Sequence, residues 1–102
     1  MPYQNDVGTI IEATILDNGA PFPIPVGSVL KIRFEKPNGQ VVTKTATVQT
    51  DGSDGVIEYE VVAGDFDQVG NWLAQGYISF NDKQWSSDPD TFEVKKILRN
   101  KV

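Results

Sequence analysis

The sequence contains no cysteine and no histidine. Without cysteine the chain cannot form disulfides, thiolate metal sites or a cysteine nucleophile. Without histidine it lacks the commonest general base, the commonest transition-metal ligand and every serine-histidine or cysteine-histidine arrangement. No glycine-rich phosphate loop leads from a strand into a helix, so nucleotide binding lacks support as well. We therefore expect no catalytic residues, no cofactor and no enzymatic activity.

Positive charge is also scarce. Nine lysines and arginines stand against fourteen aspartates and glutamates, which gives a formal net charge of -5 and opposes attraction to a phosphate backbone. The basic residues cluster near the end of the chain, at Lys95, Lys96, Arg99 and Lys101. Because no aromatic residues interleave with them, this cluster indicates a solvated tail or a contact for an acidic neighbour rather than a nucleic-acid site.

Long apolar runs are missing too. No stretch approaches the roughly 20 residues needed to span a bilayer, and the first residues show neither the basic region nor the apolar run of a secretory signal. We expect no membrane contact. The 102 residues suffice for one domain, which we divide into a short N-terminal arm (residues 1–7), a core and a basic C-terminal tail (residues 95–102).

What the sequence does contain is strand-like alternation. Residues 28–35 place Leu30, Ile32 and Phe34 on one face, and residues 72–80 place Trp72 on one face and Tyr77 on the other. Segments of this kind recur about every ten residues between turns rich in Gly, Pro, Asn and Asp, whereas no sustained helical period is present. The pattern predicts an all-β, antiparallel β-sandwich of seven to nine strands, with one short helical turn between Ala63 and Gln68.

An acidic corner precedes the aromatic-led strand. In immunoglobulin-like domains the connection into the sixth strand often carries Asp-x-Gly-x-Tyr. Asp67, Gly70 and Trp72 resemble this motif, with one more residue between Asp and Gly and with Trp in place of Tyr. The resemblance implies that the sandwich is immunoglobulin-like.

Further turn motifs in the same order extend the resemblance to one family. They are residues 5–9, 36–39, 63–67, 70–72 and 87–94. Together they make the chain similar to the immunoglobulin-like N-terminal domain of bacteriophage baseplate upper proteins. The resemblance implies a structural virion protein of a tailed phage, made in the host bacterial cytoplasm. Such a subunit of the tail or baseplate would bind other phage structural proteins, in several copies within a symmetric assembly.

The family resemblance leaves other roles open. Members are usually the first part of a longer protein, and this sequence ends soon after Val94, so we expect an adaptor, a decoration or a small subunit. A head or neck decoration protein is one alternative, and an adhesin module that binds host glycan is another. A bacterial immunoglobulin-like module without a phage link is a third.

Candidate site residues fall into two groups. The pairs Asp65/Asp67 and Asp88/Asp90 have oxygens that calcium prefers, but aspartate at a corner more often caps a turn, so we expect no metal. Core packing is the default for the aromatic side chains, Trp85 included, and Phe22 is expected to point inward from a proline-rich edge at residues 21–25. Aromatic side chains that are exposed instead, the N-terminal arm, this edge and the basic tail are the candidates for partner contact, and Tyr77 with Trp85 is the candidate glycan platform. The partner-contact candidates are Tyr3, Phe22, Tyr77, Trp85, Lys95, Lys96 and Arg99.

Overall fold

The computed structural model describes residues 3–4 and 7–96, and all the regular structure in these residues is β. This confirms the all-β prediction. No helix among the described residues is long and apolar enough to cross a membrane. The strands are β1 (Ile10–Thr14), β2 (Leu16–Asp17), β3 (Ala20–Pro21), β4 (Val29–Glu35), β5 (Val41–Thr45), β6 (Thr47–Val48), β7 (Val56–Glu60), β8 (Gly70–Phe80), β9 (Lys83–Ser86) and β10 (Asp90–Val94).

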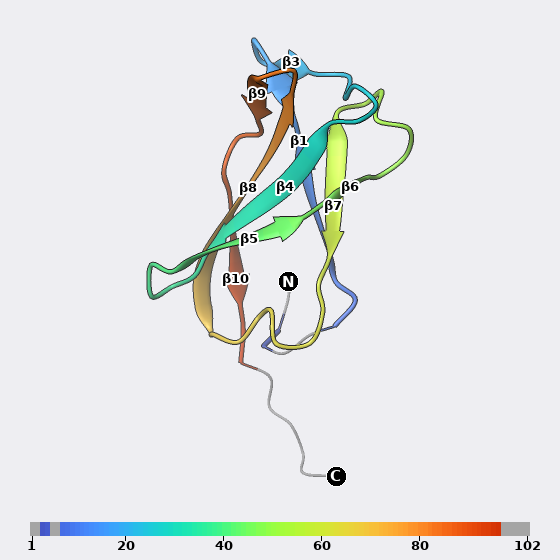
Figure 1. The fold of residues 1–102 in the computed structure, drawn as a ribbon. Coiled ribbons are helices and arrows are strands. Elements are labelled where there is room, and N and C mark those ends of the chain that lie inside the picture. Colours follow the sequence, from blue (N-terminus) through green and yellow to red (C-terminus); the bar gives the residue numbers. More distant parts are fainter. Residues whose placement is uncertain (1–2, 5–6, 97–102) are drawn as a thin grey trace.

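The strands form two antiparallel sheets that pack face to face (Figure 1). The small sheet has the order β1-β7-β6, and the large sheet has the order β3-β2-β9-β8-β4-β5, with β10 also paired to β8. The chain changes sheet at two buried residues, Ile15 between β1 and β2 and Ala46 between β5 and β6. The threonine-rich residues after position 40 therefore form two strands, β5 and β6, in different sheets.

Alternating burial follows the sequence pattern along the central strands. In β8, Trp72, Ala74 and Ile78 are buried, while Tyr77 on the opposite face is half-buried. In β4, Ile32 and Phe34 are likewise buried. Period-two burial is what a strand with one core face requires, so the predicted inward faces of β4 and β8 are confirmed.

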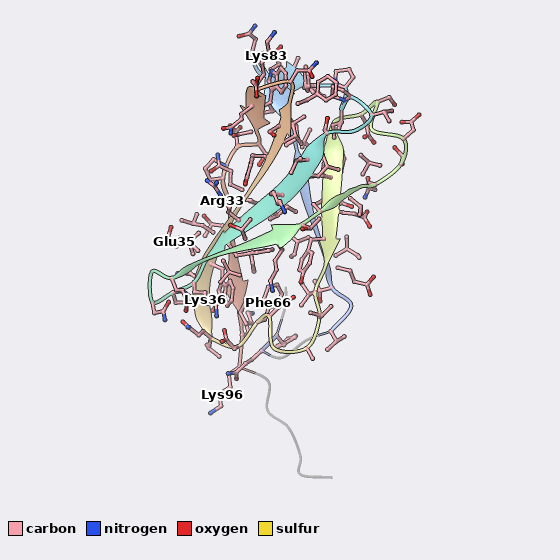
Figure 2. All side chains as sticks on the ribbon, viewed as in Figure 1. Arg33, Glu35, Lys36, Phe66, Lys83 and Lys96 are labelled. Carbon is pink, nitrogen blue, oxygen red and sulfur yellow. The ribbon has the colours of Figure 1, made fainter. Side chains whose placement is uncertain are left out.

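An aromatic cluster fills one end of the core. The Trp72 ring lies edge-on to Phe34 and Phe66, with centroids 6.5 and 5.3 Å apart, and it stacks on Phe92 at 6.2 Å. Its indole Nε1 donates a hydrogen bond to the Gln68 carbonyl at 3.0 Å, so the polar atom of the buried side chain is satisfied. Figure 2 shows Phe66 between the two sheets.

A β-bulge separates β9 from β10. Ser86 pairs with Tyr77, and Asp90 pairs with Ala74. Asp90 is four residues after Ser86, whereas Ala74 is only three residues before Tyr77, so one residue between β9 and β10 is extra. Ser87 holds the bulge, because its Oγ accepts a hydrogen bond from the Gly76 N-H at 2.9 Å and its own N-H donates to the Gly76 carbonyl at 2.9 Å. The extra residue allows β9 and β10 to share the same edge of β8.

Two details of the prediction differ from the structure. The described residues form ten strands rather than seven to nine. Residues 63–68 form no helical turn; they form a hydrogen-bonded turn and bends, closed by the Asp65 N-H on the Val62 carbonyl at 3.1 Å. The Asp65 carboxylate also accepts from the Val62 N-H at 2.9 Å. These short-range bonds use the donors and acceptors that a helix would need, and Gly64 adopts a positive φ of 88° that ends any helical run.

Candidate protein-contact surfaces

Asp65 is the best-connected carboxylate of the corner. It accepts hydrogen bonds from the Tyr59 hydroxyl and the Val62 N-H, and its Oδ1 lies 3.2 Å from the Lys44 Nζ. These contacts join the corner to β7 and β5, which belong to different sheets. Asp65 therefore ties the two layers together, as expected for a structural cap.

These contacts shift two pKa values in opposite directions. Burial raises the pKa of Tyr59 from 10.0 to about 12, and the hydrogen bond to the negative Asp65 carboxylate adds to that rise. Burial would also raise the pKa of Asp65, but hydrogen bonds from Tyr59 and Val62 and the charge of Lys44 together outweigh it and lower the pKa.

The two shifts predict loss of stability at both ends of the pH range. The unfolded chain takes up a proton at Asp65 before the folded chain does, so the unfolding free energy falls as pH drops below about 5. The folded chain holds the Tyr59 proton longer, so the unfolding free energy also falls as pH rises from 10 through about 12. Urea denaturation over a pH series should show Asp65→Asn flattening the acid limb and Tyr59→Phe flattening the alkaline limb.

The control for this series is Asp17→Asn, which removes an exposed carboxylate on β2. It should leave both limbs as they are in the parent protein. Limbs that keep their slopes in Asp65→Asn and Tyr59→Phe would show that the corner does not carry the pH dependence.

The other proposed metal ligands are arranged differently. Both carboxylate oxygens of Asp67 lie 3.1 Å from the Lys36 Nζ, so a lysine ammonium already occupies the cationic position beside it. Asp88 and Asp90 are exposed at the bulge, on the far side of β8 from β4. Within the described residues, no group of three or more acidic side chains is close enough to hold a metal ion.

A small cavity lies beside the corner. It has a volume of about 80 Å³, and its lining includes Lys36, Lys44, Asp65 and Trp72. Small-molecule sites are typically about 300–1,000 Å³, so this cavity is too small for a metabolite or a sugar ring.

Trp85 and Tyr77 lie on opposite faces of the large sheet. Trp85 is the cross-strand partner of the buried Ile78, so its side chain lies on the inner face of the sheet. It stacks on Phe22, with ring centroids 4.3 Å apart, and both rings pack against the core. Tyr77 is opposite Ser86, and the Arg33 guanidinium carbon lies 4.4 Å from its ring centroid on the outside. The structure therefore does not bring Tyr77 and Trp85 together as a glycan platform, and it gives Phe22 and Trp85 an internal packing role.

The terminal candidates lie at the opposite end of the molecule from β3. Tyr3 forms a parallel bridge with Lys95, and the Gln4 N-H donates to the Lys95 carbonyl at 2.8 Å. Lys95 is half-buried, whereas Lys96 is exposed and projects beyond the end of the sandwich (Figure 2). Arg99 lies outside the described residues.

The outer face of β5, β4 and β8 carries exposed apolar side chains, and we call it the outer face below. Glu35 lies between Val41 on β5 and Leu73 on β8, which are 59% and 39% exposed. Arg33, two residues before Glu35 in β4, lies on the same face, and its guanidinium group covers the Tyr77 ring. Figure 2 shows Arg33 and Glu35 projecting from this side of the large sheet.

A shallow depression of about 370 Å³ lies at this place, between Arg33, Val41, Leu73 and Pro89. Sequence reasoning put Tyr77 on this face but missed Arg33, Val41 and Leu73 as contact residues. The alternation in residues 28–35 and 72–80 already placed Arg33 and Leu73 outward, so the signal was present; only the strand order brings them beside Val41.

The fold and these surfaces define an antiparallel β-sandwich domain, and in the part of the chain that the structure describes its candidate contact sites lie on a sheet face and at one end of the sandwich. The chain belongs to the BppU N-terminal domain family, the N-terminal domain of baseplate upper proteins, whose family model matches residues 3–101. It is thus a domain of the phage baseplate structural type, and family membership implies association with the virion. A search among curated proteins gave no match to the chain.

Proposed function

We propose that this domain acts as an assembly or adaptor module of the phage tail or baseplate, and that it works through protein-protein contacts rather than through catalysis. The observation that carries the proposal is the outer face, where Val41 and Leu73 are exposed beside the Arg33-Tyr77 pair. Exposed apolar side chains beside arginine and tyrosine are typical of the centre of a protein interface.

The strand arrangement makes this face suitable for a rigid contact. Val41, Leu73 and Arg33 project from β5, β8 and β4, which are neighbours in one hydrogen-bonded sheet. Their side chains are therefore held in register by the backbone, so little ordering entropy is lost on binding. By contrast, the outer face of the small sheet carries Glu12 opposite Glu58, a like-charged pair that disfavours an apolar contact.

Several copies of the domain would surround a shared partner in this proposal. Chains of net charge -5 repel one another, and a shared partner that bridges the copies would offset this repulsion. The end of the domain where Tyr3 bridges Lys95 would add a second contact, since the exposed Lys96 follows there directly. We propose one domain over residues 1–102, with Tyr3 and Lys96 at this second contact.

The test is incorporation of a variant into particles. Val41→Asp combined with Leu73→Asp should leave the domain folded but lower its amount per purified virion, measured by mass spectrometry, about tenfold or more, because each tenfold loss corresponds to only about 1.4 kcal/mol of contact energy.

The matched control is Val26→Asp combined with Val69→Asp, which changes two exposed valines in loops outside β4, β5 and β8. This control should be incorporated like the parent protein. Equal incorporation of both double variants, with unchanged melting temperatures, would refute the outer face as the contact.

A further inference from the structure

A groove runs along one open side of the sandwich, between β1 of the small sheet and β10 of the large sheet. Its lower part has a volume of about 440 Å³ between Thr9–Glu12 and Phe92, and its upper part has about 290 Å³ and reaches Leu16 and Pro89. Both parts share Glu12, Ala74 and Asp90. We call the two parts together the lateral groove.

Both ends of the lateral groove are closed by backbone pairing. At one end the chain passes from β1 into β2, where Leu16 pairs with Ser86 of β9. At the other end Tyr3 pairs with Lys95. Between these bridges, no described strand pairs with the outward edge of β1. The groove is therefore a window in the side of the sandwich with a strand edge exposed along it.

The free edge of β1 presents unpaired peptide groups. The Thr9 carbonyl accepts a hydrogen bond from the Val61 N-H, and the Ile15 N-H donates one to the Gly55 carbonyl. Val61 and Gly55 flank β7, so both bonds lie on the β7 side of β1. Peptide groups alternate sides along a strand, so those of Ile10, Glu12 and Thr14 point toward the open side. They form a template for one added strand.

The free edges away from the lateral groove carry features that oppose strand addition. β3 contains Pro21, β6 is only two residues long, and β5 carries Lys44. Prolines, short strands and lysines are the usual means of protecting an edge. β1 and β10 each span five residues and have neither proline nor lysine, so the two edges that border the lateral groove are the ones best suited to pairing. Just beyond β10, Lys95 is already bridged to Tyr3, and we place the added strand on β1.

Charge indicates the kind of strand that fits. Glu12, Asp88 and Asp90 line the lateral groove, and among the described residues no lysine or arginine lines either part of it. A second copy of this chain is disfavoured, because each copy has a net charge of -5 and pairing of two β1 edges would bring Glu12 near its own counterpart. A basic segment would instead neutralise these carboxylates.

We propose that the lateral groove binds an extended segment of a different polypeptide, bearing lysine or arginine at alternate positions, which pairs with β1 as an additional strand. Its backbone bonds to Ile10, Glu12 and Thr14. Its basic side chains lie toward Asp88 and Asp90, because the Glu12 carboxylate accepts a hydrogen bond from the Gln49 side chain on the far side of β7. This site is separate from the outer face, and evidence against either contact would leave the other unaffected.

The test uses a capped synthetic peptide of alternating lysine and valine, titrated into the isotope-labelled protein and followed by amide NMR shifts. Shifts should concentrate on residues 9–14 and 88–92, and binding should weaken with salt. A peptide with glutamate in place of lysine should not bind. A lysine peptide with N-methyl groups at alternate residues should lose most of its affinity, because it cannot pair with a strand edge.

Protein variants separate backbone pairing from charge. Thr14→Pro removes an N-H that points to the open side without breaking the β1-β7 ladder, and it should lower peptide affinity about fivefold, whereas Thr14→Val should not. Asp88→Asn combined with Asp90→Asn should lower affinity about five- to tenfold, and Glu35→Gln on the outer face should not. Val41→Asp combined with Leu73→Asp should bind the peptide like the parent protein.

Three results would overturn the proposal. The first is no NMR shift at about 1 mM lysine peptide. The second is equal binding of the glutamate or N-methylated peptides. The third is self-association of the protein through residues 9–14, seen by sedimentation, which would make a second copy the occupant. If Thr14→Pro fails to fold, the N-methylated peptide still tests backbone pairing on the unaltered protein.

Discussion

Replacing Trp72 with alanine is expected to lower the unfolding free energy by about 3–5 kcal/mol, the cost typical of removing a large buried aromatic side chain. Trp72 is 2% exposed and contacts Phe34, Phe66 and Phe92. Alanine would leave a cavity among these rings and an unpaired Gln68 carbonyl. Each kcal/mol corresponds to about 4–8 °C of melting temperature in a domain of this size, so thermal and urea denaturation should show a large shift.

Tyr77→Ala is the matched control, because it removes an aromatic ring from the other face of the same strand. Tyr77 lies on the outer face under Arg33, outside the core cluster, so the expected loss is about 1 kcal/mol or less. Trp72→Phe should fall between the two, since it keeps a ring but loses the bond to Gln68. A larger loss in Tyr77→Ala than in Trp72→Ala would contradict the assignment of inner and outer faces.

The second large effect is expected at Gly55, in the turn before β7. Gly55 has a φ of 75°, and a Cβ there would lie 2.9 Å from the Phe22 carbonyl oxygen and 3.0 Å from the Ile15 carbonyl oxygen. Alanine would meet backbone that is itself held by hydrogen bonds, namely Ile15 N-H to Gly55 O and Phe22 N-H to Ile15 O, both at 2.8 Å. We expect Gly55→Ala to cost about 2–4 kcal/mol from positive φ and overpacking together.

Gly64→Ala separates these two causes. Gly64 has a φ of 88°, but a Cβ at this position would have no described atom within 4 Å, so only the backbone conformation is penalised, at about 1–2 kcal/mol. Denaturation of both variants gives the steric part by difference. If Gly55→Ala lost no more stability than Gly64→Ala, the close approach of the proline-rich edge to this turn would be incorrect.

Local patterns in the sequence were enough to predict the strands and their inner faces. The alternation around Ile32 and Trp72 specifies the buried side wherever a strand is long, because a shift by one residue would expose the whole apolar set. The proline-rich segment was correctly predicted at an edge, since Pro21 lies in the edge strand β3. The family was recognised from the order of the turns, and the family match confirms it.

Features that depend on strand pairing could not be predicted in the same way. Trp85 lies in a short strand with polar neighbours, so its inward direction depends on its pairing with Ile78 and its stacking on Phe22. Pro89 marks a break between the last two strands, but the one-residue shift in register at Ser87 becomes visible only when both strands pair with β8. The lateral groove requires β1 and β10 to lie on the same side of different sheets, which only the full topology determines.

The corner that precedes β8 has a structural role. Asp65 links β7 to β5 through Tyr59 and Lys44, and Asp67 pairs with Lys36 at the end of β4. Contact functions are assigned instead to the outer face and the lateral groove, where side chains and peptide groups remain accessible. The fold thus separates the residues that hold the two sheets together from those proposed to bind partners.

Cryo-electron microscopy of the assembled particle tests the proposed contact role most directly. We expect density for this β-sandwich in the tail or baseplate, with a neighbouring polypeptide covering Val41 and Leu73 on the outer face. Density in which that face is open to solvent in every copy, or the absence of the domain from the tail and baseplate, would contradict the proposed role.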